Sequence, residues 1–249
     1  MNTSGNTILI TGGATGIGYA LAETLLQHDN TVIICGRREK KLQEAQHHHP
    51  QLHIKICDVS DERQRHDLTT WTTQHFPDLN ILINNAGIQR TINFKTGDNK
   101  RPTTEDEIDI NLKAPIRLSE LYIPQLLNQP HAAIINVSSG LGFCPLAIMP
   151  VYCATKAALH SFTVSLRFQL RNTPIQVFEV IPPIVDTELD QGARDQRGQQ
   201  NHGIPPIDVA AAVMKALEHD DEEITVGMAT GLRDSARTNM QIFNRMNPQ

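Results

Sequence analysis

The sequence predicts a single α/β domain with a doubly wound parallel sheet of about seven strands and helices on both faces. Three observations predict this fold class. Short apolar, β-branched runs alternate with stretches of helical periodicity along nearly the whole chain. The runs are apolar throughout, which suits parallel strands covered on both sides. The 249 residues suit one domain, and no short solenoid-type repeat is visible.

The expected elements follow one another in strand and helix order. The first strand is expected at Thr7–Thr11 and a helix follows its glycine-rich turn. Further strands are expected at residues 31–35, 52–57, 79–83, 132–137, 175–181 and 223–226, and further helices at 62–76, around residues 111 and 156, and at 207–217. The polar, glycine-rich segment 188–206 is expected to be a mobile lid or a disordered loop. Residues 1–249 are predicted to form one nucleotide-binding domain.

Composition restricts the partners. The formal net charge of -5 leaves no broad basic field, which disfavours nucleic acid and anionic membrane surfaces as partners. No apolar run is long enough to span a membrane, and no signal peptide is visible. The four cysteines lack the spacing of a disulfide framework or a metal site, which suggests free thiols in a reducing cytoplasm. We expect a cytoplasmic protein with a small-molecule partner.

The segment from Thr11 to Gly18 (T-G-G-A-T-G-I-G) lies between a predicted strand and a predicted helix. Glycine permits positive φ and lets a pyrophosphate approach the backbone, while the helix N-terminus offers unpaired N–H groups. This context favours a dinucleotide site, with Gly12, Thr15, Gly16, Ile17 and Gly18 as candidate contacts. A glycine-rich turn without a ligand is the alternative.

Gly36 and Arg37 follow the second strand, where an acidic residue would bind the ribose hydroxyl of NAD. A guanidinium there suits the 2′-phosphate of NADP instead. The sequence therefore favours NADP, with NAD possible. The alternative is that the arginines begin a solvated helix.

Three other polar groups are ambiguous. Asp58, next to Val59 at a strand end, is a candidate for binding an adenine amino group or for capping the next helix. Asn85, in the turn Asn84-Asn85-Ala86-Gly87, is expected to hold backbone groups beside a ligand. The histidines at 47–49 are interpreted as a helix exit and no metal is expected, because no further ligands are in view.

Tyr152 and Lys156 are four residues apart, so on a helix they share one face. A fixed positive charge favours the phenolate and lowers the pKa of tyrosine, which makes an acid–base device. Ser139, at the end of an upstream strand, is a candidate for orienting a substrate oxygen. An ordinary amphipathic pair is the alternative interpretation.

Asn111 precedes Pro115 by four residues in a predicted helix. Proline has no N–H, so the Asn111 carbonyl loses its helical donor and the helix should bend. A freed carbonyl that faced the interior would bind a water. The alternative is a surface kink with Asn111 in solvent.

These motifs, in this order and spacing, resemble those of the short-chain dehydrogenase/reductase family, and Val177 to Thr187 resembles its DltE-like bacterial branch. The resemblance runs from about Thr7 to Val226 and implies a Rossmann sheet, NAD(P) and an enzyme that transfers a hydride between an alcohol and a carbonyl. It implies that Tyr152 exchanges the proton, Lys156 holds the nicotinamide ribose, Ser139 polarises the substrate oxygen and Asn111 anchors a relay water. It adds Val185 and Thr187 as cofactor contacts and implies a homodimer or homotetramer.

One residue departs from the family pattern. Pro183 stands where the family usually has glycine, and it should stiffen the base of the lid. Beyond the site, Leu141, Phe143, Pro145, Leu146, Ile148 and Met149 are expected to form an apolar substrate wall, with Gln89 and Arg90 as polar contacts. A second hypothesis remains: a catalytically silent, nucleotide-sensing protein on the same fold.

Overall fold

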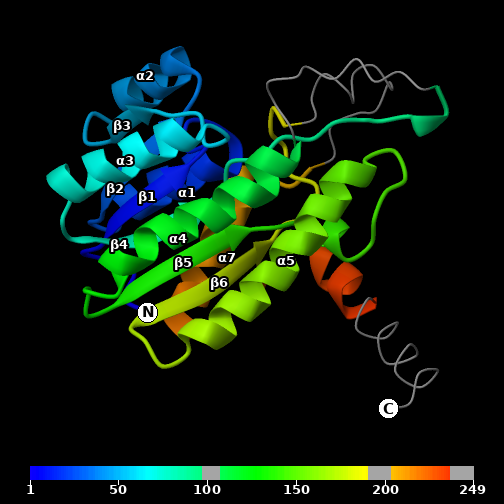
Figure 1. Cartoon of the computed structure of the whole chain (residues 1–249). Helices are drawn as coiled ribbons and strands as arrows, with labels where there is room; N and C mark the ends of the chain where they lie inside the picture. Colours follow the sequence, from blue (N-terminus) through cyan, green and yellow to red (C-terminus); the bar gives the residue numbers. More distant parts are fainter. Residues whose placement is uncertain (97–106, 190–202, 236–249) are drawn as a thin grey trace.

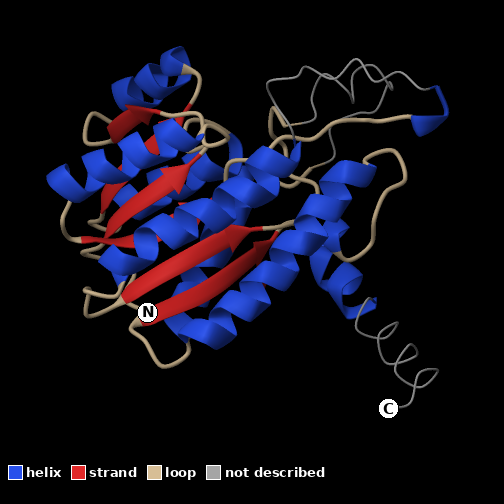
Figure 2. Cartoon of the chain, in the orientation of Figure 1, coloured by secondary structure: helices blue, strands red, loops and turns tan. Residues whose placement is uncertain are grey.

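The computed structural model describes residues 1–96, 107–189 and 203–235. Seven parallel strands form one sheet in the order β3-β2-β1-β4-β5-β6-β7. Helices cover both faces of this sheet (Figure 2). The predicted fold class is therefore confirmed.

The strands lie close to the predicted ranges. They are β1 (Thr7–Thr11), β2 (Thr31–Gly36), β3 (His53–Ile56), β4 (Leu79–Asn84), β5 (Ala132–Val137), β6 (Ile175–Ile181) and β7 (Glu223–Thr225). The ends of β1, β5 and β6 are as predicted. The central strands β2 and β4 each extend one residue further than predicted, and the edge strands β3 and β7, which have one neighbour each, are shorter than predicted.

The helices divide into two layers (Figure 1). The layer of α1 (Gly16–Leu26), α2 (Glu39–His48) and α7 (Pro206–His219) packs on one face, and α3 (Glu62–His75), α4 (Ala114–Leu126) and α5 (Pro150–Leu170) pack on the other. Each layer has its own apolar core. Two short 3₁₀ turns, η1 (Phe94–Thr96) and η3 (Gly140–Gly142), lie in the loops after β4 and β5, and residues 229–235 beyond β7 are helical.

The helix before α4 differs from the prediction of a simple bend at Pro115. Residues Asp109–Lys113 form a π-helical turn, η2, in which the Ala114 N–H bonds to the Asp109 carbonyl. Pro115 follows at once in α4, which continues this turn without a break, so residue 115 has no N–H to donate to the Asn111 carbonyl. The extra residue in the turn accommodates the proline. The sequence predicts the start of this helix at Thr103 and Thr104, which precede three acidic residues; both threonines lie outside the described residues.

The chain order reverses between β1 and β4, because the strands run outward from β1 in one direction and from β4 in the other. In such a sheet the crevice at the carboxyl ends of these strands is the usual ligand site. The glycine loop, the 84–87 turn and the serines after β5 all lie at this edge. None of the described helices is both long and apolar enough to cross a membrane.

Candidate active site

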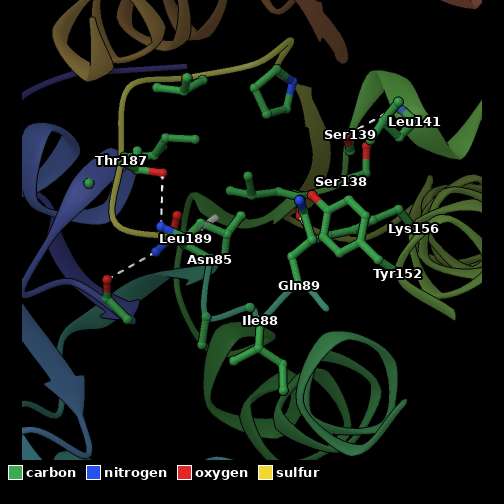
Figure 3. A pocket seen from close by; sticks show the side chains of 18 of the residues that line it. Asn85, Ile88, Gln89, Ser138, Ser139, Leu141, Tyr152, Lys156, Thr187 and Leu189 are labelled. Atoms are coloured by element: carbon green, nitrogen blue, oxygen red, sulfur yellow. Dashed lines mark hydrogen bonds between the residues drawn. The ribbon is translucent and has the colours of Figure 1, made fainter. Parts of the chain in front are cut away.

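The carboxyl edge of the sheet opens into a cavity of about 1000 Å³. Thirteen of the candidate residues line it: Gly12, Thr15, Gly16, Ile17, Arg37, Asp58, Val59, Asn85, Ser139, Tyr152, Lys156, Val185 and Thr187. Figure 3 shows side chains from the ends of several strands and from α5 around one space. Gly18 and Asn111 do not line the cavity, but each contacts a residue that does, Asn85 and Ile88 respectively.

The glycine loop is built to expose its backbone. Gly12 and Gly16 have φ of 64° and 58°, a region that side-chain-bearing residues rarely adopt. Thr15, the N-cap of α1, makes no side-chain cap bond, and the first turn contains no acidic residue. Because the first N–H groups of a helix have no internal partners, this terminus is suited to an anion such as a pyrophosphate.

The 84–87 turn locks the glycine loop in place. The Asn85 side chain donates to the carbonyls of Thr11 and Gly12 at 2.9 and 3.1 Å, and Thr11 Oγ1 accepts from the N–H groups of Asn85 and Ala86. A Cβ on Gly18 would lie 2.4 Å from Asn85 Nδ2. Asn85 thus holds backbone groups, as predicted, and Gly18 is needed for this close packing.

The polar side chains that follow β2 and β3 have partners in the protein. Asp58 Oδ1 accepts from the N–H and hydroxyl of Ser60, so the carboxylate forms a local turn, while Asp61 caps α3. Arg38 donates to Glu188 at 2.6 Å and to Thr15 at 3.0 Å. The Arg38 side chain lowers the pKa of the Glu188 carboxyl. Sequence reasoning missed this contact between the start of α2 and the segment after β6.

The phenol and the ammonium lie one helical turn apart on α5. Tyr152 is 6% exposed and Lys156 4% exposed, and the Lys156 Nζ lies 5.7 Å from the centre of the phenol ring. Nζ donates to the Val137 carbonyl at 2.8 Å. Burial lowers the pKa of Lys156 to about 8, while the charge of Glu179 acts to raise it. The alternative interpretation places the lysine in water, and the burial of Lys156 contradicts it.

Ser139 follows β5 and faces the cavity (Figure 3). Its Oγ accepts the Leu141 N–H at 3.1 Å and so caps the turn η3. A hydroxyl that accepts through a lone pair keeps its own proton for donation. Ser139 is therefore able to donate to an oxygen in the cavity.

Asn111 is 0% exposed, so the alternative of a solvent-facing kink is wrong. Its side chain accepts the Ile88 N–H at 2.9 Å and donates to the Ile88 carbonyl at 2.8 Å. Asn111 Nδ2 also lies 3.2 Å from Thr155 Oγ1 on α5. Asn111 therefore ties the π-helical turn to α5 and to the loop after the 84–87 turn.

The predicted apolar wall is largely present. Leu141, Pro145, Leu146, Ile148 and Met149 line the cavity, with Gln89 and Arg90 near them. Phe143 does not line the cavity, and its ring lies 4.6 Å from that of His160. Met228 and Leu232, beyond β7, also line the cavity and were not expected there; Leu232 lies against Gly140 of η3, a contact between residues far apart in the sequence.

The segment predicted as a lid is described only at its ends. Val185 bridges Ile204 in parallel, so the two ends meet, and the Thr187 Oγ1 accepts the Leu189 N–H at 3.4 Å. Residues 190–202 lie outside the described residues. The histidine run ends α2 at His48, and His49 contacts Glu23. Among the described residues no cluster of three or more potential metal ligands occurs.

The family model of the short chain dehydrogenases matches residues 6–198 of this chain. The chain belongs to the short-chain dehydrogenase/reductase family. It is 48% identical to the uncharacterised oxidoreductase DltE of Bacillus subtilis over 250 residues, which cover 100% of this chain and 99% of that one, so it belongs to the DltE-like branch.

Solved structures of the family have the same fold. A short chain dehydrogenase from Burkholderia cenocepacia in complex with NADP is 25% identical, with a TM-score of 0.82 and full coverage of both chains, each 100%. A short chain dehydrogenase/reductase from Burkholderia phymatum in complex with NAD has a TM-score of 0.84 at 20% identity, covering 100% of this chain and 98% of the other. The protein is thus an oxidoreductase of a family whose members bind a nicotinamide cofactor.

Proposed function

We propose that this short-chain dehydrogenase/reductase transfers a hydride between a nicotinamide cofactor, NADP in preference to NAD, and a carbonyl or alcohol substrate. The observation that carries this proposal is the buried Tyr152 and Lys156 pair in the cavity that the glycine loop also lines. When bound, the nicotinamide supplies the hydride chemistry. The protein residues bind, orient and move the proton.

Tyr152 is the proposed general acid in reduction and the general base in oxidation. With a pKa of about 8, Lys156 keeps most of its positive charge at neutral pH. A positive charge in a buried site favours the phenolate and lowers the pKa of the phenol. In reduction the phenol donates its proton to the oxygen on which negative charge develops.

Ser139 is proposed to donate a second hydrogen bond to the same substrate oxygen. Its Oγ accepts the Leu141 N–H, which leaves the hydroxyl proton for this purpose. A donor fixed before the reaction stabilises charge that develops in the transition state. Ser139 thus polarises the carbonyl and orients it toward Tyr152.

Asn111 is proposed to hold a relay water through its main-chain carbonyl. Its side chain is occupied by Ile88 and Thr155, so the main-chain oxygen is the group that the π-helical turn offers. Such a water would connect Lys156 with bulk solvent and return a proton to the site after each reduction.

The cofactor is proposed to span the cavity from Arg37 to Thr187. Gly12, Gly16 and the N-terminus of α1 fit the pyrophosphate, because glycine lets it approach the backbone and the first N–H groups of the helix have no internal partners. The Gly12 N–H itself donates to the Cys35 carbonyl. Gly36 leaves open space, since a Cβ there would meet nothing within 4 Å. Arg37 beside this space supports a preference for the 2′-phosphate of NADP. Asp58, Val59 and Val185 are the further proposed contacts.

The proposed substrate is a carbonyl compound or alcohol with an apolar body. Leu141, Leu146, Ile148 and Met149 line the cavity beyond Tyr152. Arg90 lies near this wall and is the proposed contact for a polar or anionic end of the substrate.

A homodimer or homotetramer in the cytoplasm is part of the same proposal. On α5, Phe168 is 65% exposed and Val164 is also exposed, which favours burial against another copy of the chain. All four cysteines are free thiols, as suits a reducing compartment. Light scattering of the purified protein tests the assembly; a monomer would remove this part of the proposal.

The test of the proposed function is turnover by the purified protein. The protein is mixed with NADPH and a panel of apolar aldehydes and ketones, and with NADP and the matching alcohols. Turnover should change the absorbance of the reduced nicotinamide. The competing hypothesis is a catalytically silent nucleotide sensor. Tight NADPH binding by calorimetry without turnover on any substrate would favour that hypothesis.

A further inference from the structure

A buried acidic residue lies beside the proposed active site, and the proposed mechanism does not use it. Glu179, in the otherwise apolar middle of β6, is 0% exposed. Its Oε1 accepts from the Ser138 hydroxyl at 2.5 Å, and its Oε2 lies 2.7 Å from the His160 Nδ1. A buried carboxylate is costly unless it is hydrogen-bonded and paired, so this position calls for an explanation.

Glu179 belongs to a row of polar side chains across the sheet. In the strand register Asn84 pairs with Asn136, and Asn136 pairs with Glu179. Asn84 Nδ2 donates to Asn136 Oδ1 at 2.9 Å, and Asn136 Nδ2 donates to Thr163 Oγ1 at 2.9 Å. The row joins β4, β5 and β6 to α5 just before the strands reach the cavity.

The residues that follow this row in β5 are functional candidates. Val137 gives its carbonyl to the Lys156 Nζ, Ser138 binds Glu179, and Ser139 faces the cavity. On α5, His160 is one turn beyond Lys156, so both side chains share a face of the helix. Glu179 therefore contacts the strand end and the helix that together carry the proposed mechanism.

The charges around Glu179 identify the cations that depend on it. Titratable groups on the elements packed around β6 are Tyr152, Cys153, Lys156, His160 and Arg167 on α5, Glu222 and Glu223 at β7, and Arg233 beyond it. Glu222 pairs with Arg167 and Glu223 with Arg233. The acids at β7 thus have their own cations, whereas Glu179 contacts His160 and its charge acts on Lys156.

We propose that Glu179 is a positioning residue for hydride transfer: its carboxylate fixes the Ser138–Ser139 end of β5 and supplies the negative charge that keeps the buried Lys156 ammonium protonated. This inference rests on the role of Lys156 in the proposed function. Glu179 itself does not line the cavity. The raised pKa of His160, caused first by its hydrogen bond to Glu179, agrees with a negative charge at this position.

The test is the pH dependence of NADPH binding to the full chain, measured by fluorescence titration between pH 6 and 10. In the parent, affinity should fall as Lys156 loses its proton near pH 8. Glu179→Gln should move the midpoint of this fall to lower pH by about one unit, because the opposite charge is gone. Glu179→Asp keeps the charge, so its midpoint should lie close to that of the parent.

Glu223→Gln is the matched control, since it removes a carboxylate from the neighbouring strand position that pairs with Glu179. Its midpoint should equal that of the parent. Should Glu179→Gln fail to fold, Glu179→Met is the second neutral variant, because apolar residues of similar volume often replace buried charges without loss of stability. A neutral variant that binds NADPH with the parental midpoint would overturn the proposal, even if its affinity is lower.

The same variants separate this inference from the proposed function. Binding by the parent without turnover would end the hydride-transfer proposal, yet the midpoints would still decide the electrostatic role of Glu179. Where turnover is measured, the alkaline decline of reductive kcat/KM should move with the binding midpoint. A purely structural role would lower kcat and leave the midpoint in place.

Discussion

The Nζ of Lys156 lies 5.7 Å from the centre of the Tyr152 ring, one turn along α5, and both side chains are buried. In water such a pair would contribute little, because solvent screens the charge. In the cavity wall the charge acts on the phenol through a less polarisable medium. The proposed chemistry therefore depends on burial as much as on spacing.

The activity should depend on pH through Lys156. Its pKa is lowered by burial from 10.5 to about 8, so the side chain is charged below pH 8 and neutral above it. Because the reduction needs both the charged amine and the protonated phenol, kcat/KM for NADPH-dependent reduction should be high near pH 7 and fall as pH rises through 8. Initial rates from pH 6 to 10 check this. A rate that stays constant up to pH 10 would contradict it.

Ser139→Ala should lower kcat by about 10²- to 10³-fold, because one preorganised donor to the substrate oxygen is lost. NADPH affinity should change little, since the serine is proposed to contact the substrate oxygen. Ser165→Ala, an exposed position on α5, is the matched control and should retain parental activity. Equal activity of the two variants would exclude Ser139 from the mechanism.

Arg37→Ala should weaken NADPH binding by roughly 10- to 100-fold, which corresponds to one charge-assisted hydrogen bond, and leave NADH binding almost unchanged. Calorimetric titration with both cofactors measures the ratio. Arg63→Ala, an exposed arginine of α3, controls for the loss of one positive charge. An unchanged ratio of the two affinities would show that Arg37 does not select the cofactor.

Gly18→Ala should destabilise the fold by about 1–3 kcal/mol and weaken cofactor binding, because the new Cβ would lie 2.4 Å from Asn85 Nδ2 and 2.5 Å from the Gly12 carbonyl. The clash separates the glycine loop from the turn that holds it. Gly231→Ala is the control, since a Cβ there meets nothing within 4 Å. Thermal unfolding with and without NADPH checks both variants; equal melting temperatures would contradict the packing argument.

Local sequence patterns predicted most of the fold. The ends of β1, β5 and β6 were predicted to the residue, because turn-forming residues, Gly12, Ser138 and Pro182, follow these strands directly. The edge strands β3 and β7 were predicted too long, since pairing at an edge ends before the apolar run does. Pro115 signalled a disturbance of its helix, but its position alone did not distinguish a bend from a π-helical turn.

The candidate site was predictable wherever its residues belong to one local motif. The glycine loop and the Tyr152 and Lys156 pair are of this kind. Side chains that meet through the strand register were missed, such as Ser138 and Glu179, although a single acidic residue inside an apolar strand was a usable signal. The contact of Arg38 with Glu188 joins positions 150 residues apart and has no local signature.

The decisive comparison for the role of Tyr152 is the turnover of Tyr152→Phe beside that of Tyr122→Phe. The Tyr122 hydroxyl lies in the core, 2.8 Å from Thr72 Oγ1, so its removal is a matched loss of one buried hydroxyl far from the proposed chemistry. With NADPH and the best carbonyl substrate of the parent, Tyr152→Phe should lose at least about 10²-fold in kcat and still bind NADPH, while Tyr122→Phe stays near the parental rate. Parental turnover by Tyr152→Phe would contradict the proposed mechanism.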